Sequence, residues 1–218
     1  MVTRSTLLLL SLASALIYLS LTLVILHFFH DDSPASLFDH GFGVPVQLLA
    51  GAAFGAVAAA AISLVIWRTP ISEILSDYAI VDMVMKMRFS QFDRAQISFF
   101  AGVGEELLFR GAMQPILGVW LTSLIFVGLH GYFKFNSLRH ILFGVMMFSL
   151  SVGLGLLFEW VGLVAAMTAH VVYDFIMLQI SHRLPVPETR EESAGDGLSP
   201  TDTPGQAPES SPHQTDDR

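Results

Sequence analysis

Long apolar segments constrain the fold of this chain more than any other feature of its sequence. Six of them, residues 7–29, 44–67, 94–113, 116–133, 141–158 and 162–180, approach the roughly 20 residues that a helix needs to cross a ~30 Å hydrocarbon core. The first is longer than the h-region of about 7 to 15 residues in a signal peptide, so we interpret it as a retained span. With 53% hydrophobic and 14% charged residues, the sequence predicts an all-α, polytopic transmembrane bundle of about six spanning helices, which forms one domain over residues 1–183.

The segments between the spans differ in character. Residues 51–61 of the second span read GAAFGAVAAAA, and such small side chains permit close contact between helices. Residues 68–93 contain Arg68, Lys86 and Arg88, which makes them too charged to cross. We expect a helical connector at the membrane interface there.

Lysine and arginine placement predicts the orientation, because short cytoplasmic loops are enriched in these residues. If all six segments cross, Arg4, the 68–94 connector, the 134–139 loop and Arg183 fall on one side. The opposite loops carry Asp39, Glu159 and the Asp31–Asp32 pair without a lysine or arginine. The pattern predicts cytoplasmic termini, and we expect the membrane to be a bacterial inner, or plasma, membrane.

Most of the net charge of −8 belongs to the C-terminal tail. Residues 184–218 hold eight acidic residues against Arg190 and Arg218. This segment is rich in Pro, Ser and Thr and poor in large apolar residues, so we expect it to be disordered and cytoplasmic. The rest of the chain is nearly neutral and lacks a basic stripe, which argues against a nucleic-acid partner. The absence of cysteine excludes thiol catalysis and cysteine metal sites.

Charged residues inside a predicted span require an explanation, because charge at membrane depth costs several kcal/mol. Glu106 and Arg110 are four residues apart and can form an ion pair within one helix. Glu105 is rotated by about 100° from Glu106 and has only apolar helical neighbours. A desolvated carboxylate without a local counter-charge is a candidate general base. The alternative is an interfacial residue on a helix that does not cross.

Two later spans also carry polar residues. His130 lies near the end of the fourth, and His170 shares a helix face with Asp174 in the last. A single histidine in an apolar helix is usually a packing residue, but two histidines with Glu105 and Asp174 indicate one shared cavity. Such groups can deprotonate water directly or bind a divalent metal, such as zinc, that does so. We assign no chemistry to the histidines at span ends and loops, which are His27, His30, His40, His140 and His182.

Three motifs in order, EELLFR at 105–110, FVGLH at 126–130 and HVVYD at 170–174, resemble the CPBP family of intramembrane proteases. That family includes the CAAX prenyl endopeptidases and bacterial relatives labelled abortive-infection or bacteriocin-processing proteins. The resemblance covers about residues 94–180. It implies a hydrolase that cleaves a peptide bond within the bilayer, with Glu105 activating water, His130 positioning it, and Glu106 and Arg110 supporting the site.

The last motif departs from the family, in which HxxxN is common and its His and Asn are suggested to stabilise the oxyanion. An ionised aspartate cannot donate a hydrogen bond, so Asp174 must be protonated, orient His170 or ligate a metal. If the enzyme is metal-dependent and metalloprotease-like, the expected ligands are Glu105, His130, His170 and Asp174. We favour metal-free base catalysis.

Three functional hypotheses remain open. The first is an endopeptidase acting on a membrane-associated protein or peptide, with lipid as its surroundings. The second is a non-catalytic immunity or scaffold protein that retains the same fold. The third, a proton-coupled carrier, would be expected to show repeat symmetry, which the sequence lacks.

Overall fold

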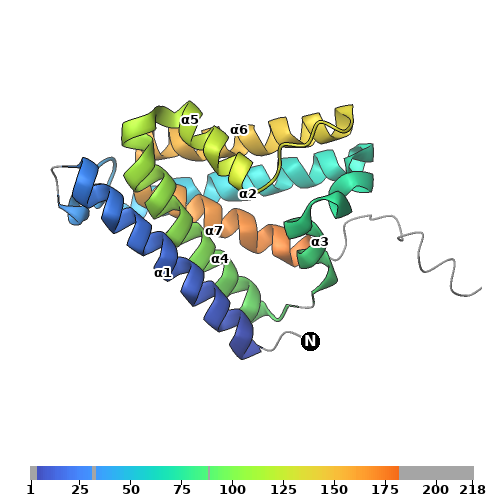
Figure 1. The fold of residues 1–218 in the computed structure, drawn as a ribbon, viewed down its shortest axis with the longest axis horizontal. Coiled ribbons are helices and arrows are strands. Elements are labelled where there is room, and N and C mark those ends of the chain that lie inside the picture. The colour runs from blue at the N-terminus through green and yellow to red at the C-terminus, as the bar shows by residue number, and fades with distance from the viewer. Residues whose placement is uncertain (1–3, 31–32, 88, 182–218) are drawn as a thin grey trace, which may run out of the picture. The chain divides into compact units, whose positions relative to one another are not determined.

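The computed structural model of the protein describes residues 4–30, 33–87 and 89–181, and every regular element within them is helical (Figure 1). This confirms the all-α prediction. The elements in chain order are α1 (Arg4–Phe29), η1 (Pro34–Phe38), α2 (Val44–Arg68), η2 (Pro70–Asp77), α3 (Ala79–Lys86), α4 (Gln91–Glu106), η3 (Leu107–Met113), α5 (Gln114–Leu129), α6 (Leu138–Val161) and α7 (Leu163–Ile180). The predicted disordered tail, Arg183 and the Asp31–Asp32 pair lie outside the described residues.

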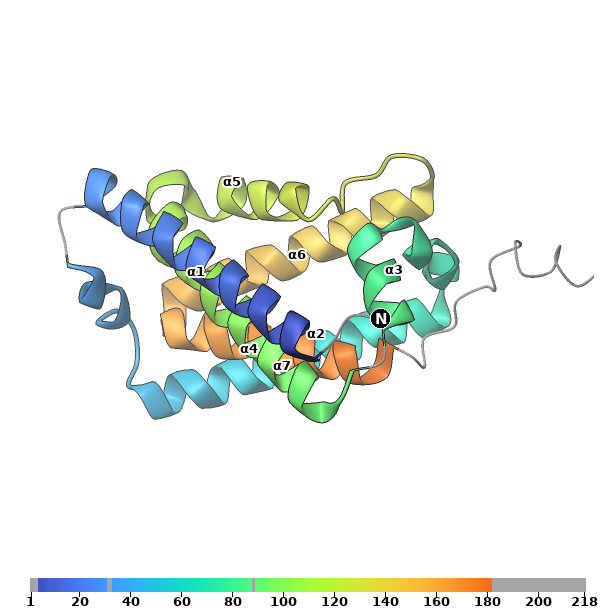
Figure 2. The same cartoon turned by 60° about the horizontal axis from the view of Figure 1, so that its bottom comes forward.

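Five segments of the described chain are long and apolar enough to cross a membrane, which indicates an integral membrane protein. They are Ser5–Phe29, Val44–Arg68, Gln91–Leu129, Leu138–Val161 and Leu163–Ile180. The count differs from six because the predicted spans 94–113 and 116–133 correspond to one 39-residue segment, which ends at Leu129. That segment comprises α4, η3 and α5, and α5 turns away from the direction of α4 (Figures 1 and 2).

The break within this long segment lies at Gly118 and not at the nearby Pro115. Pro115 stands in the first turn of α5, where a missing backbone N–H costs nothing. Gly118 has φ 74° and ψ 164°, a conformation that glycine adopts readily. The C-terminal boundary also moves: α5 ends at Leu129, so His130 is its C-cap and not a residue inside a span reaching residue 133.

Helix α7 lies in the middle of the bundle and packs against α2, α4 and α6 (Figure 1). Gly51 and Gly55 make the contact with α2 close, as the small residues of this span predicted. A Cβ at Gly51 would lie 2.4 Å from the Ala165 oxygen, and one at Gly55 would lie 2.4 Å from the Ala169 oxygen. Small-xxx-small spacing of this kind brings two helix backbones together, and it fixes the position of α7 just before His170.

Adding a methyl group at this contact is expected to destabilise the protein. Gly55→Ala should lower the free energy of unfolding in detergent by about 1 to 3 kcal/mol, because the Cβ must push α2 and α7 apart. Gly128→Ala is the matched control, since its Cβ would be 3.8 Å from the nearest atom, Phe133 Cδ2. Denaturant titration of the two purified variants measures the difference. Equal stabilities would contradict the close packing.

The connector between α2 and α4 is helical, as predicted, and polar contacts hold it against the start of α6. His140 Nε2 lies 2.9 Å from Asp77 Oδ2, and its Nδ1 lies 2.8 Å from Ser137 Oγ. Arg139 pairs with Glu73 on the same side. These contacts position η2 and α3, which form one wall of the cavity described next.

Candidate active site

The structure brings all six predicted site residues together from four elements. Glu105 and Glu106 end α4, and Arg110 lies in η3, a π-helical segment of a kind frequent at functional sites. His130 caps α5, while His170 and Asp174 lie one turn apart in α7. Close packing aligns α4 with α7, because a Cβ at Gly102 would lie 2.6 Å from Val171 Cγ2.

Glu106 is fully buried and contacts both Arg110 and His170. The predicted ion pair with Arg110 is present, with Arg110 Nε 3.1 Å from Glu106 Oε2 and neither side chain exposed. The other oxygen, Oε1, lies 2.7 Å from His170 Nδ1. Arg110 Nη2 also donates to the backbone and side-chain oxygens of Ser151, each at 2.9 Å. Glu106 therefore joins the arginine to one of the predicted site histidines.

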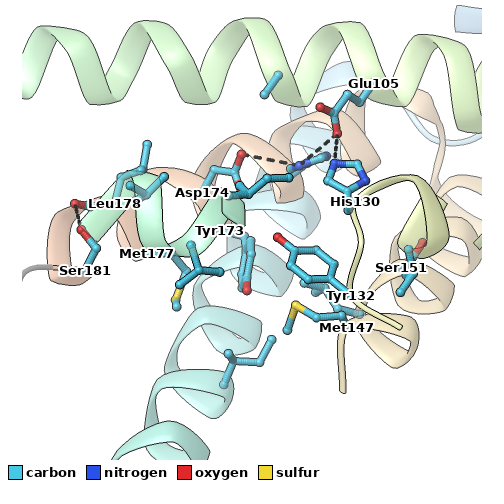
Figure 3. Close-up of a pocket in the computed structure, with 18 of the residues that line it drawn as sticks. Glu105, His130, Tyr132, Met147, Ser151, Tyr173, Asp174, Met177, Leu178 and Ser181 are labelled. Atoms are coloured by element: carbon cyan, nitrogen blue, oxygen red, sulfur yellow. Dashed lines mark hydrogen bonds and ion pairs between the residues drawn. The ribbon is translucent and has the colours of Figure 1, made fainter. Parts of the chain in front are cut away.

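Glu105 faces both histidines through a single oxygen. Its Oε2 is 3.5 Å from His130 Nε2 and 4.0 Å from His170 Nε2. Figure 3 shows Glu105, His130 and Asp174 pointing toward one another at one side of a pocket. The other oxygen, Oε1, accepts a hydrogen bond from the hydroxyl of Tyr18 at 3.3 Å. The sequence predicts no partner for Glu105 on its own helix, and in the structure its partners come from other helices.

The hydrogen bonds of Nδ1 in His130 and His170 determine the protonation of the Nε2 atoms that face Glu105. His130 Nδ1 lies 2.7 Å from the backbone oxygen of Phe126, which can only accept, so this nitrogen carries the proton. His170 Nδ1 likewise donates to the Glu106 carboxylate. In their neutral forms both rings therefore present an unprotonated Nε2 to Glu105.

Aromatic rings fix the orientation of His130. The imidazole stacks with Phe126, with ring centroids 4.3 Å apart, and with Tyr132, with centroids 5.8 Å apart and planes at 15°. Burial, followed by the charges of Asp174 and Glu105, raises the pKa of Tyr132 above its usual value. The Tyr132 hydroxyl is therefore a neutral group in this site.

Asp174 makes a longer contact to His170 than Glu106 does. Its Oδ2 lies 3.6 Å from His170 Nε2, and its side chain is 27% exposed. The short contact to His170 comes from Glu106, so Glu106 orients this ring. Of the roles considered for Asp174, orienting His170 has the least support.

The nitrogen and oxygen atoms that converge here also bear on metal binding. A lone pair on each Nε2 and a carboxylate is suitable ligand chemistry for zinc. Within residues 4–30, 33–87 and 89–181, however, no group of three or more His, Cys, Asp or Glu is arranged to hold a metal ion.

The cluster lines a mostly apolar cavity of about 420 Å³. Side chains of α1, α2, α4, α5, α6 and α7 form its walls together with the η2–α3 connector. Met147 and Met177 lie on the side away from Glu105 (Figure 3). Because methionine is flexible and polarizable, it adapts to apolar groups of different shapes. The site thus combines a polar end with a cavity suited to an apolar chain.

Sequence reasoning missed Tyr18, Phe126 and Tyr132 as parts of the site. Phe126 lies within the FVGLH motif and could have been found there; Tyr18 and Tyr132 fall in no motif. The histidines set aside stay outside the cluster where described: His30 and His40 contact backbone oxygens, and His140 contacts Asp77. His182 lies outside the described residues.

The comparisons with known proteins agree with this geometry. The sequence model of the Rce1-like type II CAAX prenyl endopeptidases matches residues 92–176. Residues 92–176 form a domain of this family. The domain begins and ends close to the limits expected from the three motifs, and it contains all six predicted site residues.

The chain is also similar to a Bacillus subtilis (strain 168) protein, "Uncharacterized protein YpbD". The two are 40% identical over 81 residues, which is 37% of this chain and 41% of that protein. The chain therefore spans less than half the length of this relative. No solved structure matches the chain at a significant level. Family membership suggests a protease, and the buried Glu105, Glu106 and His170 are consistent with its catalytic site.

Proposed function

We propose that the protein is an intramembrane endopeptidase that cleaves a membrane-associated protein or peptide. The observation that carries the proposal is the approach of two anchored histidine Nε2 atoms to one oxygen of Glu105, at the edge of an apolar cavity in a membrane protein. A structural packing role would not require the Glu105 carboxylate and the Nε2 atom of a neutral His130, both of them acceptors, to converge without a donor between them. A water molecule can supply those donors.

The proposed reaction begins with that water. One of its hydrogens is donated to Glu105 and the other to His130 Nε2, which orients a lone pair toward the scissile carbonyl. Glu105 removes the first proton as the oxygen attacks, and then delivers it to the leaving amine. A proton shared between His170 Nε2 and Asp174 would supply a donor for the oxyanion. Glu106 and Arg110 hold His170 in place during these steps.

The apolar cavity supports a substrate that enters from lipid. We propose that an apolar segment or a lipid-modified chain end occupies the part near Met147 and Met177, with the scissile bond beside Glu105. We further propose residence in a bacterial inner membrane, and the lysine and arginine distribution supports cytoplasmic termini.

A comparison of membrane proteomes tests the proposal. Cells lacking the protein are complemented with wild type, His130→Ala or His27→Ala, and new peptide termini are identified by mass spectrometry. His27 is exposed on α1, so its variant is the matched histidine control. We expect termini that appear with wild type and His27→Ala but not with His130→Ala, at equal protein levels. If all three strains show the same termini, the protein is not a protease, and a scaffold or a carrier becomes the better explanation.

A further inference from the structure

Helix α1 brings a tyrosine to Glu105 from outside the CAAX endopeptidase domain. The Tyr18 hydroxyl donates to Glu105 Oε1 at 3.3 Å, while the domain begins only at residue 92. Resting on the proposed function, we propose that Tyr18 is a positioning residue that holds the Glu105 carboxylate with its other oxygen facing the water.

The packing of α1 on α4 makes this contact specific. A Cβ at Gly104, next to Glu105, would lie 3.2 Å from Tyr18 Cδ2 and 3.5 Å from the Ala15 Cα. The absence of a side chain at Gly104 thus lets the tyrosine ring lie against the α4 backbone. The Tyr18 ring lies against Gly104, and its hydroxyl contacts Glu105, the residue that follows.

The location of Tyr18 argues against a general membrane role. Tyrosines that anchor helices gather at the membrane–water interfaces, near helix ends. Tyr18 lies near the middle of the 26-residue helix α1, where a hydroxyl needs a partner. Although α1 is the least buried of the five candidate spans, it directs this polar group to a carboxylate that is itself 8% exposed.

The two carboxylate oxygens of Glu105 have different partners. Oε1 accepts the Tyr18 hydrogen bond, and Oε2 faces His130 and His170. Without the hydroxyl, the carboxylate can rotate about its last bond and present either oxygen. A carboxylate that rotates freely positions the attacking water less often, which slows the chemical step more than it weakens substrate binding.

Removing the hydroxyl is therefore expected to change kcat. Tyr18→Phe should lower kcat about tenfold and leave KM within about twofold, since hydrogen bonds to charged groups are the stronger ones. Tyr78→Phe is the control, because Tyr78 is a buried tyrosine whose hydroxyl lies 3.5 Å from the His140 backbone oxygen and not near Glu105. Rates are measured on a peptide spanning a cleavage site found in the proteome comparison. Incorporating 3-fluorotyrosine at position 18, which retains the hydroxyl, should preserve kcat.

A second measurement tests the contact without activity. In full-length protein in nanodiscs, the ¹⁹F resonance of 3-fluorotyrosine at position 18 is expected to move when Glu105→Gln is introduced. The same label at position 78 should not respond. An unmoved resonance at position 18, or a Tyr18→Phe enzyme with unchanged kcat, overturns the role of Tyr18.

The outcomes separate this inference from the proposed function. If His130→Ala abolishes cleavage while Tyr18→Phe cleaves at the wild-type rate, the protease assignment stands and the inference fails. If no cleavage depends on the site, the protease assignment fails, and the ¹⁹F response still decides whether Tyr18 contacts Glu105. If Tyr78→Phe lowers kcat as much as Tyr18→Phe does, the loss of activity comes from disturbed packing and not from the Tyr18–Glu105 hydrogen bond, which overturns the proposal.

Discussion

Glu105→Gln is expected to reduce cleavage by about 10²- to 10⁴-fold, the range attributed to general acid–base catalysis. The amide has nearly the same shape and can still accept a hydrogen bond from Tyr18 through its oxygen, but it cannot take a proton from water. Its NH₂ group would also donate to a histidine Nε2 and so occupy the place of the water. The rate of product formation in purified membranes measures the effect.

Two controls sharpen this prediction. Glu73→Gln makes the same chemical change at a half-exposed glutamate that pairs with Arg139, and it should cleave at the wild-type rate. Repeating the wild-type measurement with a chelator asks separately whether activity needs a metal ion. Wild-type cleavage by Glu105→Gln would remove Glu105 from the mechanism, whatever the chelator does.

The sequence was sufficient for the parts of the fold and site that depend on one helix alone. Apolar length predicted the membrane helices, and the four-residue spacing of Glu106 and Arg110 predicted their ion pair, which the structure confirms. Two histidines together with Glu105 and Asp174 in neighbouring apolar spans predicted one shared cavity. These inferences need only helix geometry and the cost of burying charge.

The contacts that could not be predicted from the sequence depend on how the helices are rotated against one another. The hydrogen bond from His170 to Glu106 requires α4 and α7 to meet at Gly102, and the Tyr18 contact requires α1 to pack at Gly104. No periodicity within a single segment determines such an arrangement. Asp174 was therefore considered for orienting His170, although the structure gives that contact to Glu106.

The buried pair also gives the largest expected change in stability. Arg110→Met should lower the free energy of unfolding by about 3 to 5 kcal/mol, because it leaves the fully buried Glu106 without its cation. Arg110 Nε and Glu106 Oε2 are 3.1 Å apart but not aligned as a hydrogen bond, so the attraction between them is chiefly Coulombic. Arg110 also loses its two bonds to Ser151 in this variant.

A double-mutant cycle isolates the pair from these other losses. Arg110→Met with Glu106→Gln should be more stable than Arg110→Met alone, because the second change removes the buried unpaired charge. The exposed Arg139–Glu73 pair is the matched control; its side chains are 44% and 51% exposed, and Arg139→Met with Glu73→Gln should show a coupling of at most about 1 kcal/mol. Denaturant titration in detergent gives all the values. Equal coupling in the two pairs would mean that water reaches Glu106, and the supporting role of Arg110 would then have to be abandoned.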